Sequence, residues 1–350
     1  MISIDEHLEG GKIMAEATKL RWGILGAARM TQVMLPALIT ADNAQLVAIA
    51  SRRPGAAAKV LNQCAPQISG VKTYDDPSLL LKDSEVEAVY LPMANEEHGE
   101  WALKVLEHGK HVLCEKPMAL KVEEIEAIEQ AATKRKLKAM EGFMYRFHPQ
   151  HQRTWEIINT GLIGDIRTIR STFSFPMTPA RMYRISRSID QGGGAMWDIG
   201  CYAIHVCRMF FQEPPSSVIA MVTTIDSGAD VSDSGVLDYG DGRYAHFDFS
   251  FQRARRAEYE IIGTQGGLKC HNVWAKPGDI PVISWQTDSG RQCVEQLPPA
   301  NHFRLEIEHF SDCVLNDTSP ALTLVDAKMN CKTINAALQS MTSGQRIDIG

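Results

Sequence analysis

Three side chains in this sequence have the types and settings that proton and hydride chemistry requires: Lys116, Asp198 and Tyr202. Lys116 lies in the segment Glu-Lys-Pro at 115–117, directly after the apolar run at 111–114, which has the composition of a short buried strand. Proline disfavours helical geometry at the residue before it, so the lysine is expected on a stiff corner at the carboxyl end of that strand. Open parallel α/β sheets bind their ligands at this edge.

Asp198, Tyr202 and His205 follow a run of three glycines at 192–194 and have the spacing i, i+4 and i+7, which predicts one shared helical face. Hydride transfer to or from a carbinol carbon needs a proton moved at the hydroxyl oxygen. We expect Tyr202 to move it, with its pKa lowered from about 10 by the Lys116 ammonium at a distance of roughly 4–6 Å. Asp198 would orient this group. A capping aspartate beside a core tyrosine is the structural alternative.

A dinucleotide-binding turn is predicted near the amino end. An apolar strand at 20–25 is followed at once by a tight turn and by apolar residues at helical spacing. The glycine fingerprint is incomplete, because Ala28 and Thr31 replace its second and third glycines. An ordinary strand–helix turn is therefore the alternative to a pyrophosphate site at the helix N-terminus. The residues assigned to cofactor binding here are Gly26, Ala27, Ala28, Arg29 and Met30.

The end of the next expected strand, at 45–50, indicates which nicotinamide cofactor is bound. An acidic residue at this position would bind the ribose 2′-hydroxyl of NAD, but the sequence has Ser51, Arg52 and Arg53. A hydroxyl and two guanidinium groups suit a 2′-phosphate, and one charge-assisted contact contributes about 1.5–3 kcal/mol. NADP is therefore predicted, with NAD as the alternative. The arginine pair would otherwise be a solvated start of the helix at 54–63.

Strand-like and helix-like segments alternate as far as residue 143, which predicts an α/β fold with a doubly wound parallel sheet of the Rossmann type. Beyond residue 144, strands separated by Gly, Asp and Pro turns predict a large, mostly antiparallel open sheet. Helices are expected again at 302–315 and 324–340. The predicted domains are 19–143 for the dinucleotide and 144–350 for the substrate, with 1–18 as an extension.

Composition narrows the class of protein. A content of 44% hydrophobic and 22% charged residues with a net charge of −6 is that of a globular protein without the basic excess that a nucleic-acid partner requires. No apolar run reaches the ~20 residues of a membrane span. The eight cysteines form no CxxC pair, which favours reduced thiols, a cytoplasmic location and no metal site. His148 and His151 are interpreted as structural.

With these motifs in place, the chain from about residue 20 onward resembles the Gfo/Idh/MocA family of oxidoreductases. The resemblance is carried by Glu-Lys-Pro at 115–117 and by the stretch from 192 to 202. It implies a Rossmann domain followed by an α/β domain whose open sheet forms homodimers or homotetramers. It also implies that Lys116, Tyr202 and Asp198, the family's acid beside them, are catalytic, while His205 would merely pack. Further cofactor contacts are assigned to Pro92, Asn95, His98, Glu115 and Lys116, and substrate contacts to Lys116, Arg184, Asp198 and Tyr202.

The sequence thus predicts an NAD(P)-dependent dehydrogenase or reductase of a small molecule, a sugar or polyol such as an aldose of the xylose type. Two alternatives stay open. A trans-dihydrodiol dehydrogenase would use the same machinery with a more apolar pocket. A non-catalytic NADP-sensing regulator is opposed by the intact set of Lys116, Asp198 and Tyr202.

Overall fold

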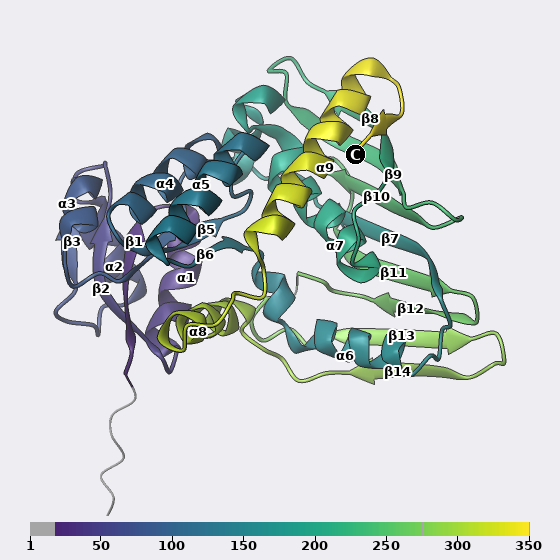
Figure 1. The fold of residues 1–350 in the computed structure, drawn as a ribbon, viewed down its shortest axis with the longest axis horizontal. Coiled ribbons are helices and arrows are strands. Elements are labelled where there is room, and N and C mark those ends of the chain that lie inside the picture. Colours follow the sequence, from purple (N-terminus) through teal and green to yellow (C-terminus); the bar gives the residue numbers. More distant parts are fainter. Residues whose placement is uncertain (1–17, 275, 350) are drawn as a thin grey trace, which may run out of the picture.

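The computed structural model describes residues 18–274 and 276–349 of the 350-residue chain. The predicted extension at 1–18 lies outside the described residues except for its last position. Figure 1 shows two lobes, one built on each of two sheets, with the helices of the amino-terminal half in purple and blue.

The first lobe is a doubly wound parallel sheet, as predicted. Within the described residues it has six strands in the order β3-β2-β1-β4-β5-β6, all parallel. The strands are β1 (Leu20–Leu25), β2 (Ala44–Ala50), β3 (Lys72–Tyr74), β4 (Ala88–Leu91), β5 (His111–Glu115) and β6 (Ala139–Gly142). Every residue of β4 is buried because helices cover both faces of the sheet, which is why these strands are continuous apolar runs.

The crossover helices of this lobe are α1 (Arg29–Thr40), α2 (Ala56–Cys64), α3 (Pro77–Lys82), α4 (His98–Glu107) and α5 (Val122–Arg135). They are amphipathic in the expected way, as in α5, where Ile125, Ile128 and Ala132 are buried at helical spacing. The strand order reverses between β1 and β4, and the carboxyl ends of β1, β2, β4 and β5 therefore surround the edge where ligands bind.

The second lobe is a sheet of nine strands among the described residues, in the order β14-β13-β12-β11-β7-β10-β9-β8-β15. It is mostly antiparallel, as predicted, with a parallel pairing between β7 and β10. Its strands are β7 (Ile166–Ser174), β8 (Ser217–Thr224), β9 (Asp230–Asp238), β10 (Tyr244–Ser250), β11 (Arg256–Gly263), β12 (Gly266–Cys270), β13 (Val282–Thr287), β14 (Gln292–Gln296) and β15 (Ile347–Asp348).

Strand β9 was not among the predicted strands. Its sequence is rich in Asp, Ser and Gly, which have low intrinsic strand propensity. It forms because β8 and β10 pair with it on either side, for example through Leu237, which lies opposite Val218 and Ala245. Tertiary pairing here overrides local preference.

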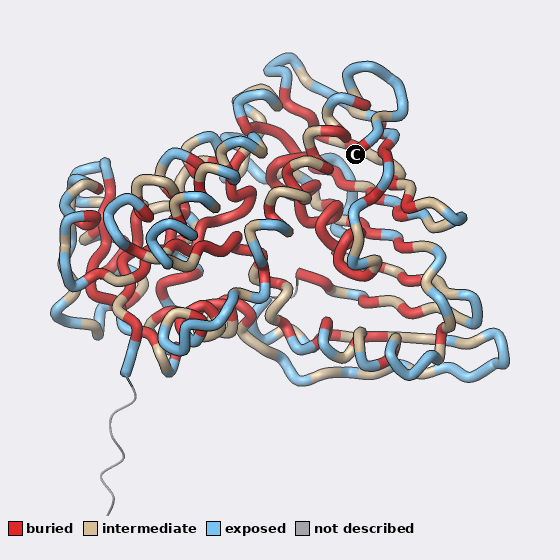
Figure 2. Tube along the Cα trace, viewed as in Figure 1, coloured by how far each residue is buried: buried red, intermediate tan, exposed pale blue. Residues whose placement is uncertain are grey.

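The remaining helices are α6 (Pro149–Asn159), α7 (Cys201–Phe211), α8 (His302–Leu315) and α9 (Leu324–Ser343), and a π-helical turn, Met196–Gly200, leads into α7. In Figure 2 the buried segments of α7 lie against the large sheet, at the centre of the molecule. Helix α8 follows that sheet in sequence but packs on the first lobe, where the Trp22 indole donates a hydrogen bond to Ser311 Oγ at 3.0 Å. The proposed domain boundary after residue 143 falls directly after β6, and both α8 and α9 return across it to pack on the first lobe.

Candidate active site

Lys116 lies at the carboxyl end of β5, where the sequence places it, and only 7% of the residue is exposed. Its ammonium group reaches across to the second lobe. Nζ donates a hydrogen bond to the backbone carbonyl of Asp198 at 2.9 Å and lies 3.4 Å from the carboxylate Oδ1 of the same residue. The lysine of one domain and the acid of the other are thereby joined.

Asp198 belongs to the π-helical turn before α7 and is buried. Burial alone would raise the pKa of its carboxyl group. Arg184, whose Nη2 lies 3.5 Å from Oδ1, and Lys116 outweigh that effect and lower the pKa to about 2. Asp198 is therefore an anion at neutral pH and lies between two cationic side chains, Lys116 and Arg184.

Tyr202 is buried on the first turn of α7, and its hydroxyl donates to the sulfur of Met144 at 3.3 Å. The Lys116 ammonium lies over the face of the Tyr202 ring, 5.1 Å from its centre. The predicted lowering of the Tyr202 pKa is wrong for this structure. Burial, and to a lesser extent the negative charge of Glu115, raises the pKa of Tyr202 well above 10. The Lys116 ammonium does not offset this, because it binds Asp198 and faces the ring rather than the phenolic oxygen.

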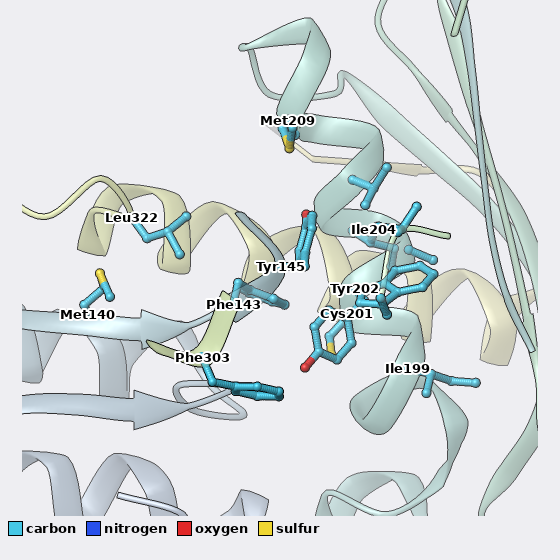
Figure 3. Packing of buried hydrophobic residues seen from close by; sticks show 14 of the residues in the cluster. Met140, Phe143, Tyr145, Ile199, Cys201, Tyr202, Ile204, Met209, Phe303 and Leu322 are labelled. Atoms are coloured by element: carbon cyan, nitrogen blue, oxygen red, sulfur yellow. The ribbon is translucent and has the colours of Figure 1, made fainter. Parts of the chain in front are cut away.

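His205 does not join this group, although the spacing predicted a shared face. It lies one turn deeper along α7, where its Nδ1 is 2.5 Å from the Tyr145 hydroxyl and its Nε2 is 2.8 Å from Asp326 Oδ2. Figure 3 shows Phe143, Tyr145 and Tyr202 in the buried cluster between the first sheet and α7. His205 is hydrogen-bonded on both sides within this cluster and does more than fill space.

The turn after β1 has the geometry of a phosphate-binding turn. Gly26 has φ +136°, a conformation that favours glycine. The hydroxyl of Thr31, which stands where the fingerprint has a third glycine, donates to the Gly26 carbonyl at 2.6 Å and accepts from the Ala28 amide at 3.0 Å. A threonine therefore stabilises the turn from inside, and the N-terminus of α1 faces the space beside it.

The two arginines after β2 lie at the same edge and are solvent-exposed. Arg52 forms an ion pair with Glu97 at 2.7 Å, and Arg53 donates to the carbonyl of Ala27 at 2.5 Å. Ser51 Oγ accepts from the Arg53 amide at 3.2 Å, which orders the corner between them. The serine and the guanidinium groups thus surround the end of β2, where the ribose of a dinucleotide lies in this fold.

Residues after β4 and β5 complete the floor of the site. Asn95 donates to the carbonyl of Gly192 at 2.9 Å and links the two lobes. The His98 ring lies between the carbonyls of Pro117 at 2.6 Å and Met93 at 3.0 Å, and burial lowers its pKa to about 4, so the ring is neutral. Burial raises the pKa of Glu115 against the opposing effect of Lys116, and Glu115 accepts a 2.6 Å hydrogen bond from Tyr90.

All of the residues predicted for catalysis, cofactor or substrate line one cavity of about 1290 Å³ between the lobes. Their individual roles stay predictions. Its walls also contain residues that the sequence did not indicate: Met144, Phe173, Phe175, Trp274, His302 and Phe303. Most of these come from loops and helix ends far apart in the chain, and no local pattern marks them.

Two absences concern the described residues only. Between 18 and 349, leaving out position 275, no group of three or more His, Cys, Asp or Glu side chains has an arrangement that could hold a metal ion. Within that same part of the chain, no helix combines the length and hydropathy needed to cross a bilayer.

Two family models match the chain. Residues 20–143 match the oxidoreductase family with an NAD-binding Rossmann fold, and residues 151–269 match the GFO/IDH/MocA C-terminal domain. The two matches fall on the two lobes in the order that the resemblance implied.

Individual relatives agree with these models. A D-xylose 1-dehydrogenase (NADP(+)) of Haloferax volcanii is 31% identical over 94% of this chain and 100% of its own length. A trans-1,2-dihydrobenzene-1,2-diol dehydrogenase of Xenopus laevis is 29% identical over 92% of this chain and 98% of its own. Among solved structures, a 3-ketoreductase from Actinomadura kijaniata in complex with NADP and TDP-benzene superposes with a TM-score of 0.85 at 29% identity, covering 92% and 98% of the two chains.

Proposed function

Since the chain belongs to the Gfo/Idh/MocA family of NAD(P)-dependent oxidoreductases, we propose that it transfers a hydride between NADP and a carbinol or carbonyl carbon of a sugar or polyol. The observation that carries the proposal is the convergence of Lys116 from the first lobe with Asp198 and Tyr202 from the second in the cavity that the cofactor residues line.

The residues present fit NADP. The left-handed Gly26 and the N-terminus of α1 suit a pyrophosphate, and Arg52 and Arg53 at the end of β2 suit a 2′-phosphate. Bound NADP supplies or accepts the hydride. The remaining work of orienting the substrate and moving its proton falls to side chains of this chain.

Tyr202 is assigned the proton at the reacting oxygen. Because burial raises its pKa, the phenol keeps its proton at neutral pH and is ready to act as an acid towards a carbonyl oxygen. The reverse reaction would need the phenol to lose that proton, which is unfavourable in the ligand-free site. In the proposed mechanism Tyr202 therefore acts as an acid in reduction, and as a base in oxidation only after it has lost that proton.

Lys116 is assigned the charge that stabilises negative charge developing on that oxygen. Its ammonium is fixed by the carbonyl and the carboxylate of Asp198, so it needs little reorganisation when substrate enters. Arg184, on the other side of Asp198, is placed to contact substrate as well. This division leaves Tyr202 as the proton carrier and Lys116 as the electrostatic partner.

A trans-dihydrodiol dehydrogenase is the second candidate, and one observation favours it. The cavity has an aromatic wall in which Phe173 and Trp274 stack at 3.9 Å with their planes 10° apart, and Phe175 and Phe303 also line it. Aromatic faces bind planar apolar rings, and they also bind the C–H faces of sugars. A non-catalytic NADP-sensing regulator is the third possibility, but such a protein would have no need of the buried pairing of Lys116 with Asp198.

The experiment that tests this function is a cofactor-resolved screen with the purified full-length protein. NADP and NAD are each offered with aldoses, polyols and aromatic dihydrodiols, and NADPH with the corresponding carbonyl compounds. Turnover of a sugar with NADP is expected. Turnover of dihydrodiols alone would favour the second candidate, and tight NADPH binding without turnover of any compound would favour the third.

We also propose that the protein is a homo-oligomer in the cytoplasm. One face of the large sheet is packed against α6, α7 and α9, whereas Ile219 and Met221 of β8 and Tyr244 of β10 are 48%, 72% and 42% exposed on the other. These exposed apolar side chains favour a homodimer or homotetramer through that face, which light scattering would measure. The eight unpaired cysteines favour the cytoplasm.

A further inference from the structure

Two buried carboxyl groups of β9 lie next to the glycine-rich turn, residues 192–194, that leads into the π-helical turn and α7. Asp230 and Asp233 are 0% and 1% exposed. The Oδ2 atom of Asp230 accepts a hydrogen bond from the backbone amide of Met196 at 2.5 Å. Asp230 Oδ1 and both oxygens of Asp233 are buried without a well-aligned hydrogen-bond partner among the described residues. The backbone of Thr223 is close enough to favour the ionised form of Asp233, and the two carboxyl groups interact with each other.

The approach of Asp230 requires the glycine opposite it. Gly194 has φ +93°, and a Cβ at this position would lie 1.7 Å from Asp230 Oδ1. A side chain of any size here would displace the carboxyl group. Of the three glycines at 192–194, this one is therefore required by contact with Asp230 as well as by its backbone conformation.

Met196 is the first residue of the π-helical turn, and Asp198 follows two residues later. The carbonyl and carboxylate of Asp198 are the groups that bind Lys116, and Tyr202 lies one turn further on. The Met196 amide is one of the unpaired donors at the start of a helical segment, and an external carboxylate that binds it fixes that start in place.

We propose that Asp230 is a positioning residue, which fixes the start of this helical segment so that Asp198 and Tyr202 meet Lys116, and that Asp233 is the protonated partner that stabilises the Asp230 carboxylate. This goes beyond the proposed function, which needs the three catalytic side chains and assigns nothing to β9.

The charges of the pair support this division. Burial, and then the neighbouring Asp230, raise the pKa of Asp233 to about 11, so that Asp233 keeps its proton. Burial also raises the pKa of Asp230, but the Asp233 hydroxyl and the amides of Met196 and Ala195 favour its ionised form. One proton shared between two carboxyl groups gives the otherwise unpartnered oxygens a donor without placing two negative charges side by side.

The test compares the kcat of four variants with that of the parent. Asp230→Ala removes the acceptor of the Met196 amide and is expected to lower kcat by about 10²-fold, the cost of a displacement of about 1 Å at a reacting group. Asp230→Asn keeps an oxygen for the Met196 amide and an NH₂ group for Asp233, so it is expected to retain most of the parental kcat. Asp233→Asn keeps a donor to Asp230 and is expected to stay within a few-fold of the parent. Gly194→Ala displaces the carboxyl group from the opposite side and is expected to resemble Asp230→Ala.

Two further readouts separate positioning from general stability. The Kd for NADPH, which the first lobe binds, is expected to stay within about twofold in Asp230→Ala, and hydrogen exchange is expected to accelerate in the peptide covering 195–202 but not in the first lobe. The exchange measurement needs no turnover, so it tests Asp230 even if the proposed function fails. A parent-like kcat and exchange rate in Asp230→Ala would overturn the proposal. So would equal losses in Asp230→Ala, Asp230→Asn and Asp233→Asn, because the pair would then act only as core. If Asp230→Ala does not fold, the comparison of Gly194→Ala with Asp230→Asn decides.

Discussion

The ammonium of Lys116 lies over the ring of Tyr202, 5.1 Å from its centre, while its hydrogen bond goes to the Asp198 carbonyl. A cation and a neutral phenol thus face the same cavity without being bonded to each other. The Tyr202 hydroxyl instead donates to the sulfur of Met144 at 3.3 Å. In the proposed mechanism this arrangement divides the chemistry between a charge, Lys116, and a proton donor, Tyr202.

Replacing Tyr202 by phenylalanine removes the proton donor and keeps the ring. Removal of a general acid typically costs roughly 10²–10⁴-fold in rate, so Tyr202→Phe is expected to lower kcat for carbonyl reduction by that order while NADPH binding persists. Stopped-flow measurement of NADPH oxidation checks this. Tyr244→Phe, at an exposed position of β10 outside the cavity, is the control and should behave like the parent. An active Tyr202→Phe enzyme would assign the proton to another group.

The raised pKa of Tyr202 also predicts how the rate varies with pH. In reduction the phenol is the reactive form, so no loss of rate from its ionisation is expected between pH 7 and about 9. In oxidation the phenolate is needed, and the rate is expected to rise with pH across the same interval. Parallel pH profiles in the two directions would check this. The prediction would be contradicted if the reduction rate of the parent fell between pH 7 and about 9 and this fall were absent in Tyr202→Phe.

Arg52 and Arg53 are expected to set the preference for NADP. Each lost charge-assisted contact costs about 1.5–3 kcal/mol, or roughly ten- to hundredfold in affinity at about 1.4 kcal/mol per decade. Arg52→Ala and Arg53→Ala should each raise the KM for NADP by this order and change the KM for NAD little. Lys59→Ala, exposed on α2, is the charge-matched control. A parent enzyme that strongly prefers NAD would refute the assignment of these arginines.

His302 is expected to make stability depend on pH. Burial lowers its pKa to about 3, so below the unfolded value of about 6.5 the unfolded chain binds a proton that the folded chain does not. Stability from this group is complete above pH 6.5 and is lost as the pH falls towards 3, at up to about 1.4 kcal/mol per pH unit. Urea unfolding at pH 7, 6 and 5 should show a shallower decline for His302→Gln than for the parent. His98 and His111 also have a pKa lowered to about 4, so the difference between the two proteins is the quantity to compare. Identical slopes would contradict the prediction.

The sequence was sufficient where local pattern decides structure. The strands and turns of the first lobe follow from apolar runs ended by Gly, Pro or charged residues, and Lys116 stands where the Glu-Lys-Pro corner predicts. It was insufficient where tertiary contact decides. Strand β9 forms by pairing on both sides despite its polar composition, and Trp274 and His302 reach the cavity from separate loops and helix ends.

The pKa of Tyr202 shows the same limit. The family resemblance implies that Lys116 and Tyr202 share a site, but the direction of the shift in the Tyr202 pKa depends on burial and on which atom the ammonium contacts. The position of His205 could not be predicted either, because helical spacing does not show how deep in the core each turn of a helix lies. Its partners, Tyr145 and Asp326, come from segments far away in the chain.

We propose that Lys116 acts on the substrate and not on the folding of the chain or the binding of NADP. Lys116→Met keeps the length of the side chain and removes its charge. With the substrate identified by the cofactor screen, kcat is expected to fall by about 10²–10³-fold, the usual cost of removing one electrostatic stabiliser. The Kd for NADPH, measured by fluorescence on the same sample, should stay close to that of the parent and of the surface control Lys59→Met. A Lys116→Met protein with parental kcat, or one that loses NADPH binding in proportion to its activity, would contradict the account.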